Sequence, residues 1–356
     1  MTGIRLLTNY RRTFLLLAIL AALVFVLSSM PLSALYFIYL GLILFPLAGM
    51  MLSAVGGWLA LFAGSALVAL GAIRLFDMPG LMVLVYMLPP ALALLVSIEM
   101  KLPYLKAGVL VLGAYVLGVL ALYLLLQQAS GGNAIPYAAQ EAIAALDSLA
   151  QRAGLLYNLW KSGLISHGQP SGTQVFIENG VGWTFTPVVL EEFYKQIAFR
   201  LETLLQSIFQ GMLTSLGIYM TAIGGYAALR LGQSAQPDGC PNLGLPDFAK
   251  WYIPRPIGKK LWVLAAGYLL MLLDFNMVVQ LAGSLMFNVF YAVYALQGLA
   301  VLDHRLSQGR LKRGLRRVLL LLIFVILQPL LVFIGILDQA RDSRGLHGDK
   351  QDMVKR

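Results

Sequence analysis

Long apolar runs follow one another along most of the 356-residue chain, and they constrain its fold more than any other feature. A helix needs about 20 apolar residues to cross the hydrocarbon core of a bilayer. Charged residues make up only 12% of the chain, about half their usual share in globular proteins, so the outer surface must be apolar as well. We therefore predict an all-α, polytopic transmembrane helix bundle.

This criterion predicts nine spans, or eight if Pro31–Phe76 is one helix rather than two helices that turn near Gly56–Gly57. The predicted spans are Thr13–Ser29, Ala34–Leu52, Trp58–Phe76, Leu81–Ile98, Ala107–Leu126, Leu204–Leu231, Leu261–Val279, Leu281–Leu302 and Val318–Leu337. They divide the chain into an N-terminal transmembrane bundle (1–126), an insertion (127–203), a C-terminal transmembrane bundle (204–337) and a polar tail (338–356).

Lysine and arginine concentrate on one side of the predicted membrane. Arginines precede the first span, and more basic residues lie in the loops Glu99–Lys106, Gly232–Lys260 and Asp303–Arg317. The last loop is the most basic and carries Arg305, Arg310, Lys312, Arg313, Arg316 and Arg317. Because basic loops stay in the cytoplasm, we predict a multi-pass protein of the bacterial cytoplasmic (inner) membrane with a cytoplasmic N-terminus and an uncleaved first span. The net charge of +10 then indicates contact with the lipid bilayer and its anionic headgroups rather than with nucleic acid.

The insertion has no basic bias, so we expect it on the extracytoplasmic side. We predict an amphipathic helix over Ala138–Leu164 and a second helix that begins at Thr186-Pro187 and continues into the sixth span. These helices could lie on the membrane surface, cover the mouth of a cavity or form a small packed cap. Nine spans would place the tail outside as well, although its nearly balanced charges favour neither side.

Polar residues in or near the spans are the candidates for a ligand site, because a polar or charged group is costly to bury in hydrocarbon. Asp274, Asn276 and Gln280 lie near the turn between the seventh and eighth predicted spans, and Gln297 lies within the eighth. We predict ligand binding by these four residues if they converge on one cavity. The alternatives are that Asp274 is hydrated at the turn and that Gln297 joins neighbouring helices.

Motifs of several familiar catalytic sites are missing from the sequence. It contains no GxxxxGK[ST] phosphate loop, no GxSxG elbow and no HExxH pair. The single cysteine, Cys240, allows no intramolecular disulfide, and the three histidines are scattered. We therefore expect no enzyme activity, no cofactor and no metal site.

The C-terminal region carries a recognisable pattern. Gln297–Ala300 (QGLA) is followed by the basic loop, by Pro329 in the last span, and by Gly335–Asp338 (GILD) with Asp342 and Arg344 after it. This pattern resembles the YybS-like, or DUF2232, family of uncharacterised bacterial membrane proteins, and the layout of the rest of the chain is similar to it. That family is in turn distantly similar to the substrate-binding subunits of energy-coupling-factor vitamin transporters, which are helix bundles.

The resemblance implies a transport-type helix bundle that binds a small solute, for example as a substrate-capture subunit without its own ATPase. The alternative is a non-catalytic membrane scaffold or assembly factor, which would hold a protein partner through the insertion or the basic loop.

Overall fold

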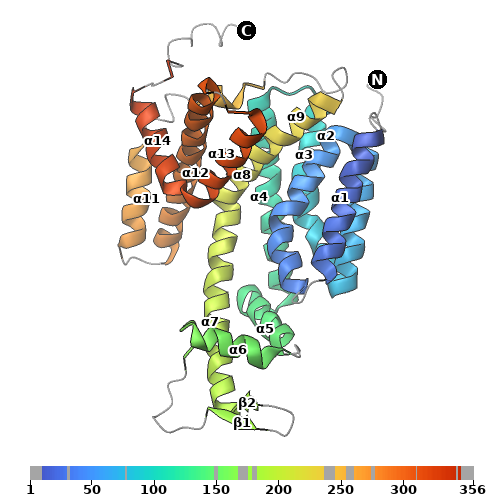
Figure 1. Cartoon of the computed structure of the whole chain (residues 1–356), viewed down its shortest axis with the longest axis vertical. Coiled ribbons are helices and arrows are strands. Elements are labelled where there is room, and N and C mark those ends of the chain that lie inside the picture. Colours follow the sequence, from blue (N-terminus) through green and yellow to red (C-terminus); the bar gives the residue numbers. More distant parts are fainter. Residues whose placement is uncertain are drawn as a thin grey trace.

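The computed structural model describes residues 10–29, 33–76, 78–147, 151–166, 175–178, 183–235, 245–253, 260–273, 277–309, 311–341 and 344–345. In these ranges the chain is almost entirely helical, with two short strands at one end (Figure 1). By length and composition six of the described helices could cross a membrane, or up to seven if a bent C-terminal pair is one span. The predicted polytopic helix bundle is therefore confirmed, and the predicted eight to nine spans are roughly compatible with it.

The N-terminal bundle consists of α1 (Tyr10–Ser29), α2 (Ser33–Phe76), the 3₁₀ helix η1 (Met78–Met82), α3 (Val83–Glu99) and α4 (Tyr104–Ala129). Helix α2 is interrupted at Gly57, whose φ of 66° and ψ of −152° are not helical and suit a residue without Cβ. A Cβ on Gly64 would lie 2.3 Å from Leu52 Cδ1, so the two halves of α2 lie side by side across this turn. The predicted turn at Gly56–Gly57 is correct, and the count of six takes both halves as one helix.

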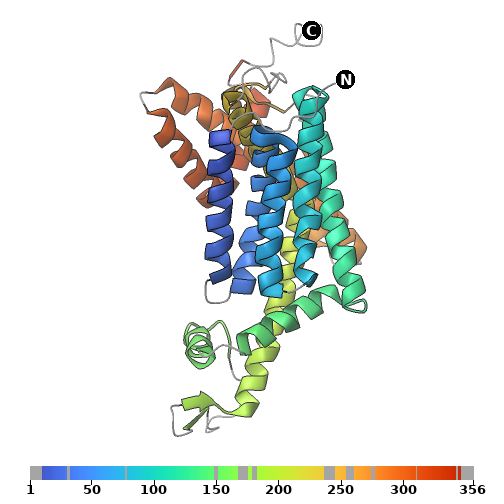
Figure 2. The ribbon, with the colours of Figure 1, turned by 90° about the vertical axis from the view of Figure 1, so that its right-hand side faces the viewer.

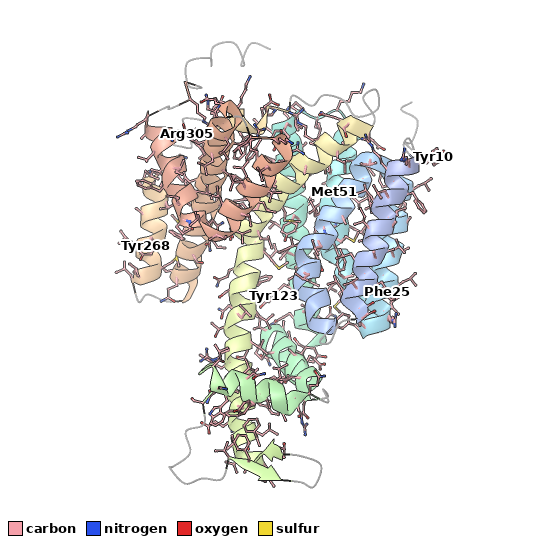
Figure 3. All side chains as sticks on the ribbon, in the orientation of Figure 1. Tyr10, Phe25, Met51, Tyr123, Tyr268 and Arg305 are labelled. Atoms are coloured by element: carbon pink, nitrogen blue, oxygen red, sulfur yellow. The ribbon has the colours of Figure 1, made fainter. Side chains whose placement is uncertain are left out.

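Apolar side chains hold these helices together. Leu20 of α1 and Met87 of α3 are buried in one cluster, while Tyr115 of α4 packs in another with Met220 of a later helix. Many outward-facing apolar side chains remain exposed, and Figure 3 shows Phe25 among them. An exposed apolar exterior is what a bundle surrounded by lipid requires.

The insertion folds into a small unit at the end of the bundle opposite the start of α1 (Figures 1 and 2). It contains α5 (Ala134–Asp147), α6 (Arg152–Lys161), β1 (Phe176–Glu178) and β2 (Trp183–Phe185). The predicted single helix over Ala138–Leu164 is thus two helices, and the Asp147 carboxylate at the end of α5 pairs with Arg152 at the start of α6 (2.5 Å). The strands pair antiparallel with Phe176 opposite Phe185. The buried core of this unit consists of Leu146, Leu156, Ile165, Phe185, Val189 and Phe193.

One continuous helical rod joins the insertion to the membrane bundle. It comprises α7 (Pro187–Gly211), the π-helical η2 (Met212–Leu216), α8 (Gly217–Tyr219), the π-helical η3 (Met220–Gly225) and α9 (Tyr226–Ala235). The rod begins at Pro187 as predicted, although the Thr186 hydroxyl makes no hydrogen bond and so does not cap it. Its 49 residues extend about 70 Å, more than twice the thickness of the hydrocarbon core, so its insertion end must project from the membrane.

The C-terminal bundle contains the 3₁₀ turn η4 (Phe248–Lys250), α11 (Trp262–Leu272), α12 (Met277–Gln308), α13 (Arg313–Ile326) and α14 (Gln328–Arg341). The predicted last span Val318–Leu337 is not one helix, because α13 and α14 meet at Leu327 with a bend of 104°. The pair forms a V whose open end lies level with the start of α1 and whose apex points into the bundle (Figure 1). We term this pair the re-entrant hairpin.

The end of the bundle where α1 begins and α14 ends is termed the basic end. It carries exposed basic side chains from several elements, namely Arg11, Lys101, Lys106, Arg305, Lys312 and Arg317. Arg344, just after α14, donates a hydrogen bond to the Ala249 carbonyl of the loop 245–253 (2.8 Å), so the tail starts at the same end as that loop. The sequence left the side of the tail open; the structure starts it at the basic end and not on the side of the insertion, because the last predicted span turns back instead of crossing.

Candidate functional site

The four predicted ligand residues do not form one described cluster. Asp274 and Asn276 lie outside the described residues. Gln280 and Gln297 both belong to α12, but they are about 25 Å apart along its axis, because a helix rises about 1.5 Å per residue. Gln280 is near the insertion end of α12 and Gln297 is near the basic end, so these two amides cannot contact the same small ligand.

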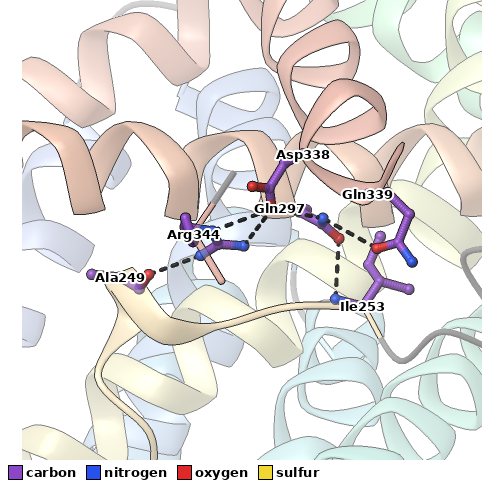
Figure 4. Close-up of polar contacts among 6 residues, drawn as sticks. All are labelled: Ala249, Ile253, Gln297, Asp338, Gln339 and Arg344. Carbon is purple, nitrogen blue, oxygen red and sulfur yellow. Dashed lines mark hydrogen bonds and ion pairs between the residues drawn. The ribbon is translucent and has the colours of Figure 1, made fainter. Parts of the chain in front are cut away.

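Gln297 is instead the centre of a buried hydrogen-bond network (Figure 4). Its side chain is completely inaccessible. The Oε1 atom accepts a hydrogen bond from the Ile253 backbone N–H (3.1 Å), and Nε2 donates to Asp338 Oδ2 (3.0 Å) and to Gln339 Oε1 (3.2 Å). Both ends of the amide are thus used within the protein. This geometry supports the structural alternative for Gln297, in which it joins helices.

Asp338 completes the network through a buried ion pair with Arg344. Their side chains are only 4% and 2% exposed, and Arg344 Nη2 lies 2.8 Å from Asp338 Oδ2. Arg344 Nε donates to the same oxygen (3.2 Å), and Nη1 donates to Ala249 O (2.8 Å). A buried pair of this kind holds its elements in place, because removing either partner leaves an uncompensated charge. It connects α14 to the loop 245–253, and Gln297 connects both to α12.

Two glycines bring α12 and α14 close enough for these contacts. A Cβ on Gly298 would lie 1.9 Å from the Leu331 carbonyl oxygen, and one on Gly335 would lie 2.1 Å from the Tyr294 carbonyl oxygen. Only residues without a Cβ allow the backbones to approach this closely. The separated parts of the C-terminal pattern, Gln297-Gly298 and Gly335…Asp338…Arg344, are therefore one contact in space.

A second set of polar contacts lies deeper in the bundle, on both sides of the π-helical η2. On its insertion side, Ser284 Oγ donates to Gln210 Oε1 (3.2 Å) and Asn288 Nδ2 donates to Ser284 Oγ (3.2 Å). On its other side, Gln328 at the apex of the re-entrant hairpin donates to the Tyr219 hydroxyl oxygen. Sequence reasoning can point to Asn288 as a polar residue within a span, but it did not single out Gln210, Ser284, Tyr219 or Gln328. Pro329 is the signal that could have marked the apex, because proline has no backbone N–H to donate to the preceding turn and is favoured in the first turn of a new helix.

The predicted basic residues divide into paired and free side chains. Arg316 Nε lies 3.0 Å from Asp303 Oδ1, and both side chains are largely buried. Arg305, Lys312 and Arg317 are exposed. For the other two predicted residues, Arg310 is outside the described residues, and Arg313 belongs to α13 but its side chain is not described.

The Asp147 carboxylate of the insertion has a shifted pKa. The Tyr194 hydroxyl donates a hydrogen bond to Asp147 Oδ1 (2.5 Å), and Arg152 Nη1 donates to the same oxygen (2.5 Å). The hydrogen bond from Tyr194 lowers the pKa of Asp147, and the charge of Arg152 lowers it further. This contact fastens the end of α5 to the rod.

Most residues of both sets of polar contacts lie in the region with a family match, and Gln339 and Arg344 lie just beyond its end. Residues 189–338 match the DUF2232 family, described as predicted membrane proteins. The family resemblance seen in the sequence is confirmed for this region, which runs from the first turn of α7 to Asp338 and includes Gln210, Tyr219, Gln297 and Gln328. No curated protein and no solved structure matches the chain. The YybS-like label and the similarity to energy-coupling-factor subunits stay predictions.

Proposed function

We propose that this DUF2232 protein is a transport-type membrane protein that binds a small polar solute between the re-entrant hairpin and the π-helical part of the rod. The observation that carries the proposal is the broken last helix, whose apex residue Gln328 contacts Tyr219 between two π-helical segments. Irregular backbone at membrane depth is tolerated where it is covered by protein or lines a cavity. Broken helices of this kind form the solute sites of many transporters.

Polar groups also recur at successive depths along α12. Ser284 and Asn288 lie toward the insertion end, and Gln297 lies toward the basic end, about 14–20 Å further along the axis. Tyr219 and Gln328 provide a further pair on α8 and α14, two elements that contact α12. These side chains are amides and hydroxyls, and the N-terminus of α14 adds a partial positive charge at the apex. The chemistry fits an uncharged or zwitterionic solute with several hydrogen-bonding groups.

The test uses the full-length protein in detergent and a panel of free amino acids, nucleosides and small amide-bearing heterocycles as probes. At least one class should raise the melting temperature of the wild type, and Gln328→Leu and Tyr219→Phe should abolish that increase. Gln308→Leu is the matched control, because Gln308 is an exposed glutamine at the basic end and should leave the increase intact. If no probe shifts the melting temperature and deletion of the protein leaves solute uptake unchanged, the proposal fails.

A specific observation also supports the scaffold alternative. The insertion has an apolar core of its own and is carried on a rod that is continuous with the membrane bundle. Val188 and Phe199 on α7 are 58% and 71% exposed and could contact a protein outside the membrane. A photo-crosslinking amino acid at position 188 or 199 should then capture a reproducible neighbour in intact cells. Captures that differ between replicates would count against a scaffold.

The orientation is also a proposal. We place the basic end in the cytoplasm of a bacterium, with the insertion outside, because the exposed lysines and arginines of α1, the α3–α4 turn and α13 all lie at that end. In this orientation the buried network of Gln297, Asp338 and Arg344 lies at the cytoplasmic end of α14. A solute that reached the apex from outside would meet this network as the last polar contact before the cytoplasm.

A further inference from the structure

The surface around the start of α13 carries unneutralised positive charge. The described part of α12 and the re-entrant hairpin contains two acidic residues, Asp303 and Asp338. Each has an arginine partner in a largely buried ion pair: Arg316 lies 3.0 Å from Asp303, and Arg344 lies 2.8 Å from Asp338. Neither carboxylate is therefore available to balance the exposed cations nearby.

Three of these cations are exposed on adjoining elements. Arg305 lies in the last turn of α12, Lys312 immediately precedes α13, and Arg317 lies in the second turn of α13. Figure 3 shows Arg305 at the basic end. No ion-pair partner for these three side chains is found among the described residues. The Arg316–Asp303 pair (3.0 Å) holds the end of α12 against the start of α13, which carry these three side chains. We term the three the cationic rim; arginine binds phosphate oxygens through parallel hydrogen bonds.

An exposed apolar strip runs from this rim toward the apex of the hairpin. It consists of side chains on α13 that are between 51% and 71% exposed, namely Leu315, Val318, Leu321, Leu322 and Val325. The 14 residues of α13 extend about 21 Å, which matches one bilayer leaflet of about 15 Å hydrocarbon plus part of its headgroup layer. Charge at one end of the helix and apolar surface along it correspond to the headgroup and acyl chains of one phospholipid.

We propose that α13 and the end of α12 bind an anionic phospholipid, with its phosphate on the rim of Arg305, Lys312 and Arg317 and its acyl chains on the apolar strip. This inference does not depend on the solute site. A zwitterionic lipid would bring its own positive group toward the rim, where both nearby carboxylates are already paired. An anionic headgroup meets only attraction there, so the site selects for negative charge.

The proposal is tested by binding of short-chain phosphatidylglycerol and of phosphatidylcholine with the same chains to the full-length protein in neutral detergent, measured by native mass spectrometry. Phosphatidylglycerol should bind more tightly, and its binding should weaken as salt is added. The triple variant Arg305→Gln, Lys312→Gln, Arg317→Gln should bind it more weakly by about fivefold for each removed charge, since a basic residue near an anionic surface contributes about 1 kcal/mol. Binding of phosphatidylcholine should not change.

A matched control removes three other exposed cations from the same end of the bundle: Arg11→Gln, Lys101→Gln, Lys106→Gln. This variant should keep wild-type affinity for phosphatidylglycerol. Glycerol phosphate, which has the headgroup charge but no acyl chains, should not compete. Equal losses in the two triple variants would show general attraction to the basic end and overturn the site. Unchanged binding in the rim variant, or full competition by glycerol phosphate, would overturn it as well.

Discussion

The ion pair between Asp338 and Arg344 provides the sharpest test of how the C-terminal pattern works. In Arg344→Gln the carboxylate of Asp338 stays buried, only 4% exposed, after losing a cation 2.8 Å away. Removal of one partner from a buried pair costs about 3–5 kcal/mol, because the remaining charge is not compensated. We expect a loss of this size in the free energy of unfolding. Asp338→Asn in the same chain should restore part of it, since the double variant leaves two neutral amides.

Denaturant unfolding in detergent, followed by tryptophan fluorescence, measures these differences. Arg341→Gln is the control, because Arg341 belongs to the same helix end but is exposed. Its loss should stay within about 0.5 kcal/mol, as for most surface substitutions. If Arg344→Gln is no less stable than Arg341→Gln, the pair is not the buried contact described above. A double variant that is less stable than Arg344→Gln alone would also contradict the reasoning. It would show that the stability lost in Arg344→Gln does not come from the uncompensated charge of Asp338.

Three further outcomes follow from the structure. Gly298→Ala should destabilise the protein by about 1–3 kcal/mol or more through overpacking against the Leu331 carbonyl. Gly113 lies in the middle of α4 and a Cβ there would meet nothing within 4 Å, so in the same unfolding assay Gly113→Ala should cause no loss of stability. In a cysteine-free background, cysteines at Gly345 and Lys161 should react with a membrane-impermeant thiol reagent from opposite sides, and labelling of both from one side would refute the hairpin. The pKa of Asp147 is lowered in the folded protein, so its contact stabilises the insertion fully above the usual aspartate pKa of about 3.9. This stabilisation is lost as the pH falls through the lower folded value. Limited proteolysis of the insertion should therefore rise at acidic pH in the wild type and depend less on pH in Asp147→Asn.

Local properties of the sequence account for the features that were predicted correctly. The length of each apolar run sets whether it can cross a bilayer, and this requires no knowledge of the neighbouring helices. Glycine at position 57 permits the turn in α2, and proline at position 187 marks the start of the rod. The family pattern around Gln297 was also visible, because it depends on residue identity alone. The grouping of basic residues at one end was likewise predictable, because it depends only on which loops carry lysine and arginine.

The sequence was not sufficient where a feature depends on contacts between distant residues. Gln280 and Gln297 are both amides in one apolar helix, and nothing in their immediate sequence shows which groups each of them contacts. Gln297 joins helices because the fold brings Asp338 and the Ile253 backbone within hydrogen-bond distance of its amide. A polar residue in a span can bind a ligand or a neighbouring helix, and the choice is made by which groups the fold brings within hydrogen-bond distance.

The sequence by itself determined that the chain is a polytopic helical membrane protein with a polar insertion and one basic side, because run length and loop charge are additive, local quantities. Only the tertiary structure decided that the last apolar run turns back. The run 318–337 is equally apolar whether straight or bent, so its hydropathy cannot distinguish a span from a re-entrant hairpin. The bend is accompanied by long-range contacts, from Gln328 to Tyr219 and from Leu331 to Gly298, and it determines on which side Asp338 and Arg344 lie.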